Sequence, residues 1–406
     1  MSPSQVPRPV HVLSPDLVSV LKNRVEATML AIIKKNRHTR CFSESPAFAA
    51  FHSAIRNFGR EDNDGISDDI LLDTFRTTIS LTTYDSYELF VAKFLSETCQ
   101  EDDVRDMFSP GLPYHIAVTS STSSPKPKFF CQYLHEGSMR YGGVKIQNRN
   151  GDLIRTIPVA MGSFETVRLR NGLKVENDHL NIILAAGEWV TSPVAVGFIR
   201  EYRTFLLMHT LFALAHSKVE TIFIVFTTSA VDMIRYMEEE WESLVASIET
   251  VGKPTDQPGW LLKIWPMLKS VISIGSGVFS VAVPKLRFHL GSDVQLRSLG
   301  FHSSKTHVAT VYDPSDLNLF KATSQDIIEY FDVTKEENAS SIVPPWLVEI
   351  GKHYEVVCTT HDGLWRYRLG DIVEIAGFDP TDGSPIICVT LNDEGKYAHN
   401  FAAFLD

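Results

Sequence analysis

The run at residues 361–371 holds the clearest candidate for chemistry in the sequence. Aromatic and cationic residues alternate over residues 365–368, which is typical of a strand with two unlike faces. Gly370 then permits a tight turn, and we expect Asp371 to face outward from it. A carboxylate accepts two hydrogen bonds at once, and the vicinal hydroxyls of a ribose supply two donors. The alternative interpretation is an ordinary surface hairpin with a turn aspartate.

A hydroxyl-rich loop at residues 119–128 is the second candidate. Phosphate binding requires backbone N–H groups, hydroxyl donors and a nearby cation, and this loop contains all three. The loop follows a predicted strand at residues 114–118 and precedes another at residues 129–133. The alternative is a Ser/Pro surface loop that binds nothing.

The N-terminal third of the chain is expected to be mainly helical up to Pro110. Ser14 and Pro15 are a helix start, with a capping hydroxyl followed by proline in the first turn. Apolar residues then follow at helical spacing. This predicted face comprises Leu17, Val20, Leu21, Val25, Leu30 and Ile33.

The middle of the chain predicts α/β layering. An apolar helix at residues 203–216 precedes a short buried strand at residues 221–226. Thr227 and Thr228 are expected to form a turn before a long amphipathic helix that reaches Ile248. Helix, strand and helix in succession indicate an α/β fold. Further strands are predicted at residues 271–274, 281–283 and 308–311.

Composition limits the classes of protein. A chain of 406 residues buries a large core, and two subdomains are expected. The net charge of −11 argues against a nucleic-acid partner. The five cysteines are scattered, which predicts neither disulfides nor a zinc site and fits a reducing cytoplasm. No apolar run reaches the ~18 to 20 residues of a membrane span, so no membrane partner is expected.

Several segments together resemble one family. Residues 367–371, followed by an apolar strand and Gly377, are similar to the ribose-binding motif of the auxin-responsive acyl-acid amido synthetases, the GH-three-type family. Residues 202–204, 231–239 and 312–320 are also similar to this family. The resemblance covers about Leu17 to Ile387 and is closest to the fungal branch. It implies the large N-terminal domain of an adenylate-forming enzyme, with mixed β-sheets flanked by helices.

The resemblance implies an activity and its cofactors. Members activate a small carboxylic acid with ATP and Mg²⁺, then transfer the acyl group to an amine, often that of an amino acid. Residues 266–291 resemble the segment beside the acyl pocket, with residues 275–280 near the bound acid. No catalytic residue is implied. The implied nucleotide-binding residues are Ser120, Thr122, Ser123, Lys128, Ser303, Ser304 and Asp371.

Four positions depart from the family motifs. Ser121 and Pro125 stand where the phosphate loop has glycine, and Pro125 lacks an N–H donor. Phe301 stands where the second motif has tyrosine, and Lys305 replaces a glutamate that helps to hold Mg²⁺. Unit charges at ~4 Å interact by roughly 4 kcal/mol at an effective dielectric near 20. Attraction for the metal therefore becomes repulsion, which weakens the expectation of Mg²⁺.

The C-terminal end gives a last expectation. We expect an adenylate-forming-type domain at residues 1–377 and a truncated hinge with a short tail at residues 378–406. The resemblance implies that family members continue into a smaller lid domain, which a separate protein partner could supply. Two functions stay open: a diverged amido synthetase of small-metabolite biosynthesis, or a non-catalytic relative that binds an acid or nucleotide, or serves as a partner module.

Overall fold

Helices dominate the first hundred residues, as the sequence predicts. The predicted cap is confirmed: α1 (Pro15–Asn36) begins where Ser14 accepts a hydrogen bond from the Leu17 N–H at 3.3 Å. Val20, expected on the buried face, is instead half exposed. The buried face of α1 comprises Leu21, Val25, Met29, Ile32 and Ile33. The computed structural model describes residues 6–57, 66–96, 98–118, 128–135, 156–159, 167–168, 174–176, 190–216, 218–246, 255–323 and 325–390.

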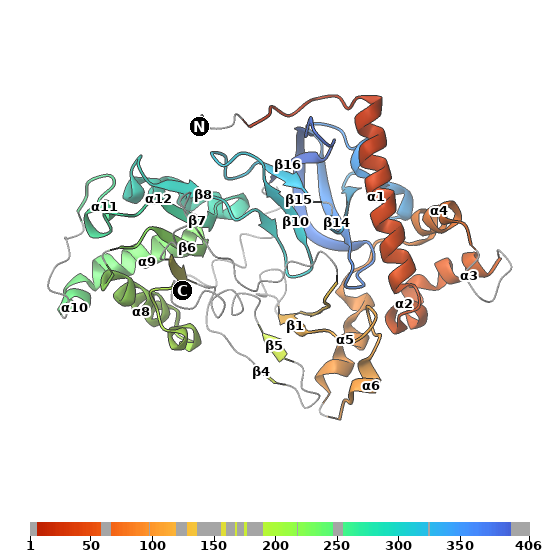
Figure 1. The fold of residues 1–406 in the computed structure, drawn as a ribbon, viewed down its shortest axis with the longest axis horizontal. Helices are drawn as coiled ribbons and strands as arrows, with labels where there is room; N and C mark the ends of the chain where they lie inside the picture. The colour runs from red at the N-terminus through yellow and green to blue at the C-terminus, as the bar shows by residue number, and fades with distance from the viewer. Residues whose placement is uncertain are drawn as a thin grey trace.

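Shorter helices complete this N-terminal layer. They are α2 (Arg40–Glu44), α3 (Ala49–Asn57), α4 (Asp68–Thr78), α5 (Glu88–Leu95) and α6 (Glu101–Val104). With α1 they lie beside an antiparallel sheet of eight strands among the described residues (Figure 1). The shared core includes Trp365, whose ring centroid is 4.3 Å from that of Phe42.

The eight-stranded sheet has the order β13-β12-β14-β15-β16-β11-β10-β9. Its strands are β9 (Phe301–His302), β10 (His307–Val311), β11 (Phe320–Ala322), β12 (Ile327–Asp332), β13 (Ile342–Val343), β14 (His353–Thr359), β15 (Tyr367–Phe378) and β16 (Pro385–Val389). The predicted strand at residues 308–311 is confirmed as β10.

A parallel sheet forms the other half of the molecule, with the order β3-β6-β7-β8. Helices cover it (Figure 1) and enclose a second hydrophobic core, consistent with the expected two subdomains. The strands are β3 (Thr156–Val159), β6 (Thr221–Phe226), β7 (Ser270–Ile274) and β8 (Gln295–Arg297). The helices are α8 (Tyr202–Leu214), α9 (Thr227–Glu239), α10 (Trp241–Val245), α11 (Leu261–Ile264) and α12 (Val283–Leu290).

Three predictions in this half are wrong. Thr227 and Thr228 form no turn, because α9 begins directly after Phe226 and the Thr227 hydroxyl donates to the Phe279 carbonyl at 2.6 Å. The predicted long helix is split at Glu240 into α9 and α10. Residues 281–283 are not a strand, because Pro284 lies in the first turn of α12 and favours a helix start there.

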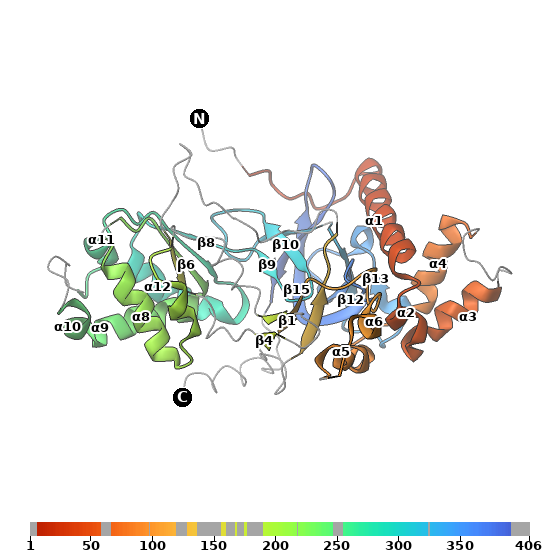
Figure 2. The ribbon, with the colours of Figure 1, turned by 60° about the horizontal axis from the view of Figure 1, so that its bottom comes forward.

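A small sheet with the order β2-β1-β5-β4 lies between the two halves (Figure 2). Its strands are β1 (His115–Val118), β2 (Phe129–Gln132), β4 (Val167–Arg168) and β5 (Lys174–Glu176), so the predicted strands on both sides of the hydroxyl-rich loop are confirmed.

The halves also meet directly. Leu317, in the loop between β10 and β11 of the eight-stranded sheet, packs against the hydrophobic core of the parallel half. A side chain at Gly275, in the parallel half, would meet Leu317 at 3.1 Å. None of the described helices is long and apolar enough to cross a membrane.

Candidate functional site

The structure describes four of the seven residues predicted to bind nucleotide. Lys128 directly precedes β2, and Asp371 lies within β15. Ser303 and Ser304 occupy the turn between β9 and β10. Ser120, Thr122 and Ser123 lie outside the described residues, as do Ser121, Pro125 and the tail after residue 390.

The conformation around Asp371 differs from the prediction. Gly370 has a φ of +84°, but it forms a bulge inside β15 instead of a tight turn. Glu355 pairs with Ile372 and Val357 pairs with Arg368, so the strands change register across the bulge. The Glu355 carboxylate fixes it by accepting the Gly370 N–H at 3.2 Å. A bulge of this kind changes the direction in which a side chain leaves an otherwise continuous strand.

Asp371 does not face outward into solvent as predicted. It is partly buried, and no described residue donates a hydrogen bond to its carboxylate. Burial raises the pKa of Asp371 to about 6, Lys305 opposes this rise, and Glu355 adds to it. A buried carboxylate normally has hydrogen-bond donors, so this one is suited to accept them from a ligand.

Lys305 lies close enough to Asp371 to interact electrostatically with it. The Lys305 ammonium lies 4.9 Å from the centroid of the Phe130 ring, and that of Lys128 lies 5.8 Å from the Tyr84 ring. The pKa of Lys305 lies below its usual value. Burial is the main cause and the charge of Lys128 adds to it, whereas the charge of Asp371 opposes it. Two ammonium groups held against aromatic rings suit a site for an anion.

The two serines hold the turn in shape. The Ser303 hydroxyl accepts the N–H groups of Lys305 and Thr306, each at 3.2 Å, and donates to the Thr306 carbonyl. The Ser304 carbonyl accepts a hydrogen bond from Gln132 at 3.0 Å. In this conformation the Ser303 hydroxyl is hydrogen-bonded to the backbone of the turn that carries Lys305.

The described residues do not fit a resident Mg²⁺ ion. They contain no group of three or more histidine, cysteine or acidic residues that could hold a metal. Among the described residues, Lys305 is the cation whose charge acts on the Asp371 carboxylate. Mg²⁺ prefers oxygen ligands, and an ammonium repels it.

The carboxyl end of the parallel sheet presents the segment expected near the bound acid. Here the rings of Phe226 and Phe279 are stacked with centroids 4.0 Å apart. Gly275 is closely packed, since an added Cβ would meet Leu317, Val283 and Thr227 at 3.1 to 3.2 Å. Ligands of α/β proteins bind at this end of parallel strands.

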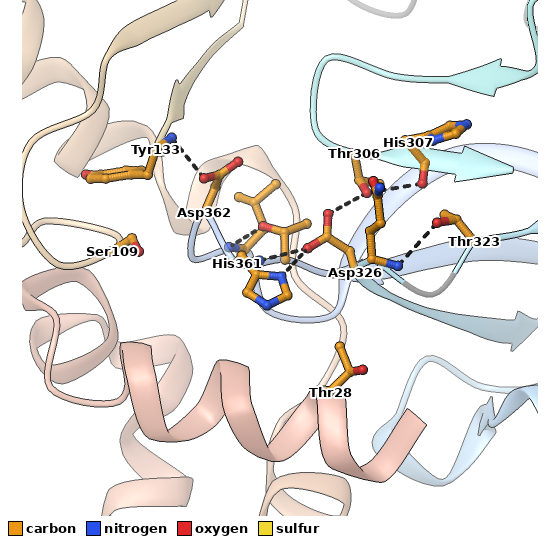
Figure 3. Close-up of polar contacts among 12 residues, drawn as sticks. Thr28, Ser109, Tyr133, Thr306, His307, Thr323, Asp326, His361 and Asp362 are labelled. Carbon is orange, nitrogen blue, oxygen red and sulfur yellow. Dashed lines mark hydrogen bonds and ion pairs between the residues drawn. The ribbon is translucent and has the colours of Figure 1, made fainter. Parts of the chain in front are cut away.

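Sequence reasoning missed a set of polar residues behind the turn, shown in Figure 3. Asp326 accepts hydrogen bonds from Thr306 and His361, and Asp362 accepts the Tyr133 N–H at 2.9 Å. His361 and Asp362 begin the run at residues 361–371, so their position was a usable signal. Asp326 lies in no recognisable motif, so nothing in the sequence indicated its role.

Comparison with solved structures defines the class of fold. The acyl acid amido synthetase AtGH3.15, in complex with 2,4-DB, aligns with a TM-score of 0.70 over 93% of this chain and 69% of its own, at 18% identity. An open conformation of 2-hydroxyisobutyryl-CoA ligase, in complex with 2-HIB-AMP and CoA, aligns with a TM-score of 0.51 over 90% of this chain and 67% of its own, at 12% identity. The predicted α/β fold of an adenylate-forming enzyme is thereby confirmed.

Sequence comparison then gives the family. Residues 55–254 match the GH3 family N-terminal domain, and residues 322–387 match the GH3 family central domain. The chain belongs to the GH3 family, which confirms the family resemblance drawn from the motifs. The second match contains Asp371, whereas Ser303, Ser304 and Lys305 fall between the two matched ranges.

Curated relatives agree with this assignment. A putative indole-3-acetic acid-amido synthetase, GH3.10 of Oryza sativa subsp. japonica, is 30% identical over 171 residues. The jasmonoyl-L-amino acid synthetase JAR6 of Nicotiana attenuata is 25% identical over 373 residues, which is 77% of this chain. The matched parts span 36% and 62% of the lengths of these two relatives.

Proposed function

We propose that this chain binds ATP and activates a small carboxylic acid as an acyl adenylate, which then reacts with an amine such as that of an amino acid. Membership of the GH3 family supports the reaction class. One structural observation carries the proposal: the Asp371 carboxylate is partly buried and receives no hydrogen bond from a described residue. Both hydroxyls of a ribose would satisfy it.

Each described group then has a role. Asp371 accepts the ribose hydroxyls, and Lys305 with Lys128 attracts the phosphates. A carboxylate oxygen of the acid attacks the α-phosphorus of ATP, and the bond to pyrophosphate breaks. The amine nitrogen then attacks the acyl carbon, and AMP leaves. Fixed cations at the phosphates favour the first step because they stabilise charge where it develops.

Relatives suggest acids to test. The names of the relatives cite indole-3-acetic acid and jasmonoyl conjugates, so both acids belong in a panel. We place the activity in small-metabolite biosynthesis in the cytoplasm. None of the five cysteines forms a disulfide, which supports a reducing compartment.

A second candidate is a protein that binds ATP or an acid without catalysing adenylation. Lys305 favours it, because a cation stands where the family motif has a metal-binding glutamate. This candidate shares the nucleotide site and differs only in chemistry.

Acid-dependent exchange of labelled pyrophosphate into ATP tests the proposal. The wild-type chain should support exchange with at least one acid of the panel, and Asp371→Asn should lose it. Asp102→Asn is the matched control, since the Asp102 side chain is 96% exposed, and it should behave as wild type. ATP binding without exchange would select the second candidate, and an absence of both would refute every function that places a nucleotide at this site.

A further inference from the structure

The turn at residues 303–306, which carries Lys305, is joined by the Asp326 carboxylate to the loop that precedes β15. Asp326 accepts a hydrogen bond from the Thr306 hydroxyl at 2.6 Å through one oxygen. Its other oxygen accepts the His361 N–H at 2.9 Å and lies 3.0 Å from His361 Nδ1 (Figure 3). Three hydrogen bonds therefore converge on a side chain that is only 14% exposed.

The same turn is attached on its other side to β2. The Gln132 side chain donates to the Ser304 carbonyl at 3.0 Å. The next residue, Tyr133, donates its N–H to Asp362 at 2.9 Å. Since Asp362 follows His361, the hydrogen bonds close a ring that joins the turn, Asp326, the loop and the end of β2. We call this closed set of hydrogen-bonded residues the 303–306 ring. Its members are Gln132, Tyr133, Ser304, Thr306, Asp326, His361 and Asp362.

Lys305 sits between the two attachments of the 303–306 ring. Its neighbours Ser304 and Thr306 are the two residues held from outside, and its own N–H is bonded to Ser303 at 3.2 Å. Its backbone therefore has little freedom. This constraint fixes the point from which the Lys305 side chain reaches the Phe130 ring.

We propose that Asp326 is a positioning residue: by joining Thr306 to His361 it sets where the Lys305 ammonium stands relative to Asp371. Asp326 forms no hydrogen bond or ion pair with either residue, so its effect is transmitted through the turn. The Lys305 ammonium faces Asp371, Lys128 and the Cys358 thiol, and Asp371 also faces Glu355. The consequence for ATP rests on the proposed function, whereas the consequence for Asp371 does not.

The titration of Asp371 reports the position of Lys305, because Lys305 lowers the pKa of Asp371. It can be followed by NMR in the full chain with ¹³C-labelled aspartate carboxyls, with the signal assigned by its absence in Asp371→Asn. Thr306→Val removes one hydroxyl without changing any charge. The pKa of Asp371 should rise from about 6 by roughly one pH unit, toward the value in Lys305→Met.

Three further variants separate positioning from stability. Thr306→Ser keeps the hydroxyl and should restore the wild-type titration. Thr323→Val is the control, since Thr323 bonds Gln325 N–H nearby but lies outside the 303–306 ring. If Thr306→Val does not fold, Thr306→Ala removes the same hydroxyl and replaces it in the test. A lower Tm with an unchanged Asp371 pKa would overturn the proposal.

ATP calorimetry on the same variants separates this inference from the proposed function. The Kd for ATP should rise by about threefold or more in Thr306→Val, because the phosphate-binding cation is displaced. If the Asp371 pKa shifts while neither wild type nor variant binds ATP, the positioning role stands and the proposed function fails. If both bind ATP equally and the pKa is unchanged, the positioning role fails alone.

Discussion

The guanidinium of Arg366 and the carboxylate of Glu329 form a buried, doubly hydrogen-bonded ion pair. The two bonds measure 3.0 and 2.9 Å, and the side chains are 2% and 4% exposed. The remaining Arg366 nitrogen donates to the carbonyls of Arg76 and Ile79. This pair fastens the start of β15, and with it Asp371, to β12 and the end of α4.

Removing one partner of this pair should be costly. Arg366→Met leaves Glu329 buried without its counterion and should lower the free energy of unfolding by about 3 to 5 kcal/mol. Adding Glu329→Leu should recover much of that loss. Lys352→Met is the control, because Lys352 and Glu349 pair with side chains 50% and 64% exposed, and it should cost less than ~1 kcal/mol. Urea unfolding measures all of these, and equal losses for Arg366 and Lys352 would contradict the structure.

Two glycines with similar backbones should respond differently to alanine. Gly363 (φ +88°) would place a Cβ 2.0 Å from the Phe108 carbonyl oxygen, whereas Gly351 (φ +77°) has nothing within 4 Å. Gly351→Ala should cost only the strain of a left-handed residue, about 1 kcal/mol. Gly363→Ala must also displace backbone and should cost roughly 3 kcal/mol or more. Comparable midpoints in thermal unfolding would show that Phe108 does not approach Gly363.

Much of the framework was predictable from local sequence. The Ser14 cap defines the start of α1, and the apolar run at residues 221–226 gives a buried strand. Both signals depend on neighbouring residues, so no long-range information is needed.

The alternating pattern at residues 365–368 was misleading for a physical reason. Trp365 and Arg366 precede β15 and are both buried, with Arg366 at a φ of +44°. Their partners lie far away in sequence: Trp365 packs on Phe42, and Arg366 pairs with Glu329. Likewise the burial of Asp371 beside Lys305 depends on tertiary contacts, which local patterns do not encode.

Asp371 should make stability depend on pH. Its pKa is raised from 3.8 to about 6, so the folded state binds a proton more tightly than the unfolded state does. Stability therefore falls as pH rises from about 4 to 6. Asp371→Asn removes this loss and should stabilise the chain at pH 7 by up to about 3 kcal/mol relative to its effect at pH 4. Denaturant titrations at the two pH values test this, and Asp102→Asn should show no such difference. A destabilised Asp371→Asn at pH 7 would mean that the ionised carboxylate has donors.

Lys305 should replace a metal as the cation beside the phosphates. The wild-type Kd for ATP should change less than about threefold when Mg²⁺ is chelated. In Lys305→Glu, ATP alone should bind at least about tenfold more weakly, because the carboxylate repels phosphate, and Mg²⁺ should restore binding. Calorimetry with and without Mg²⁺ gives these values. Wild-type binding that requires Mg²⁺ would remove this role from Lys305.

The most direct test of the nucleotide site is the ATP affinity of Asp371→Ala, measured by calorimetry at pH 8 on the folded variant. At this pH the wild-type carboxylate is ionised and can accept both ribose hydroxyls. Charge-assisted hydrogen bonds are worth about 1.5 to 3 kcal/mol each, so the Kd for ATP should rise more than about tenfold. Equal Kd values for the wild type and Asp371→Ala would place the nucleotide elsewhere and contradict the proposed site.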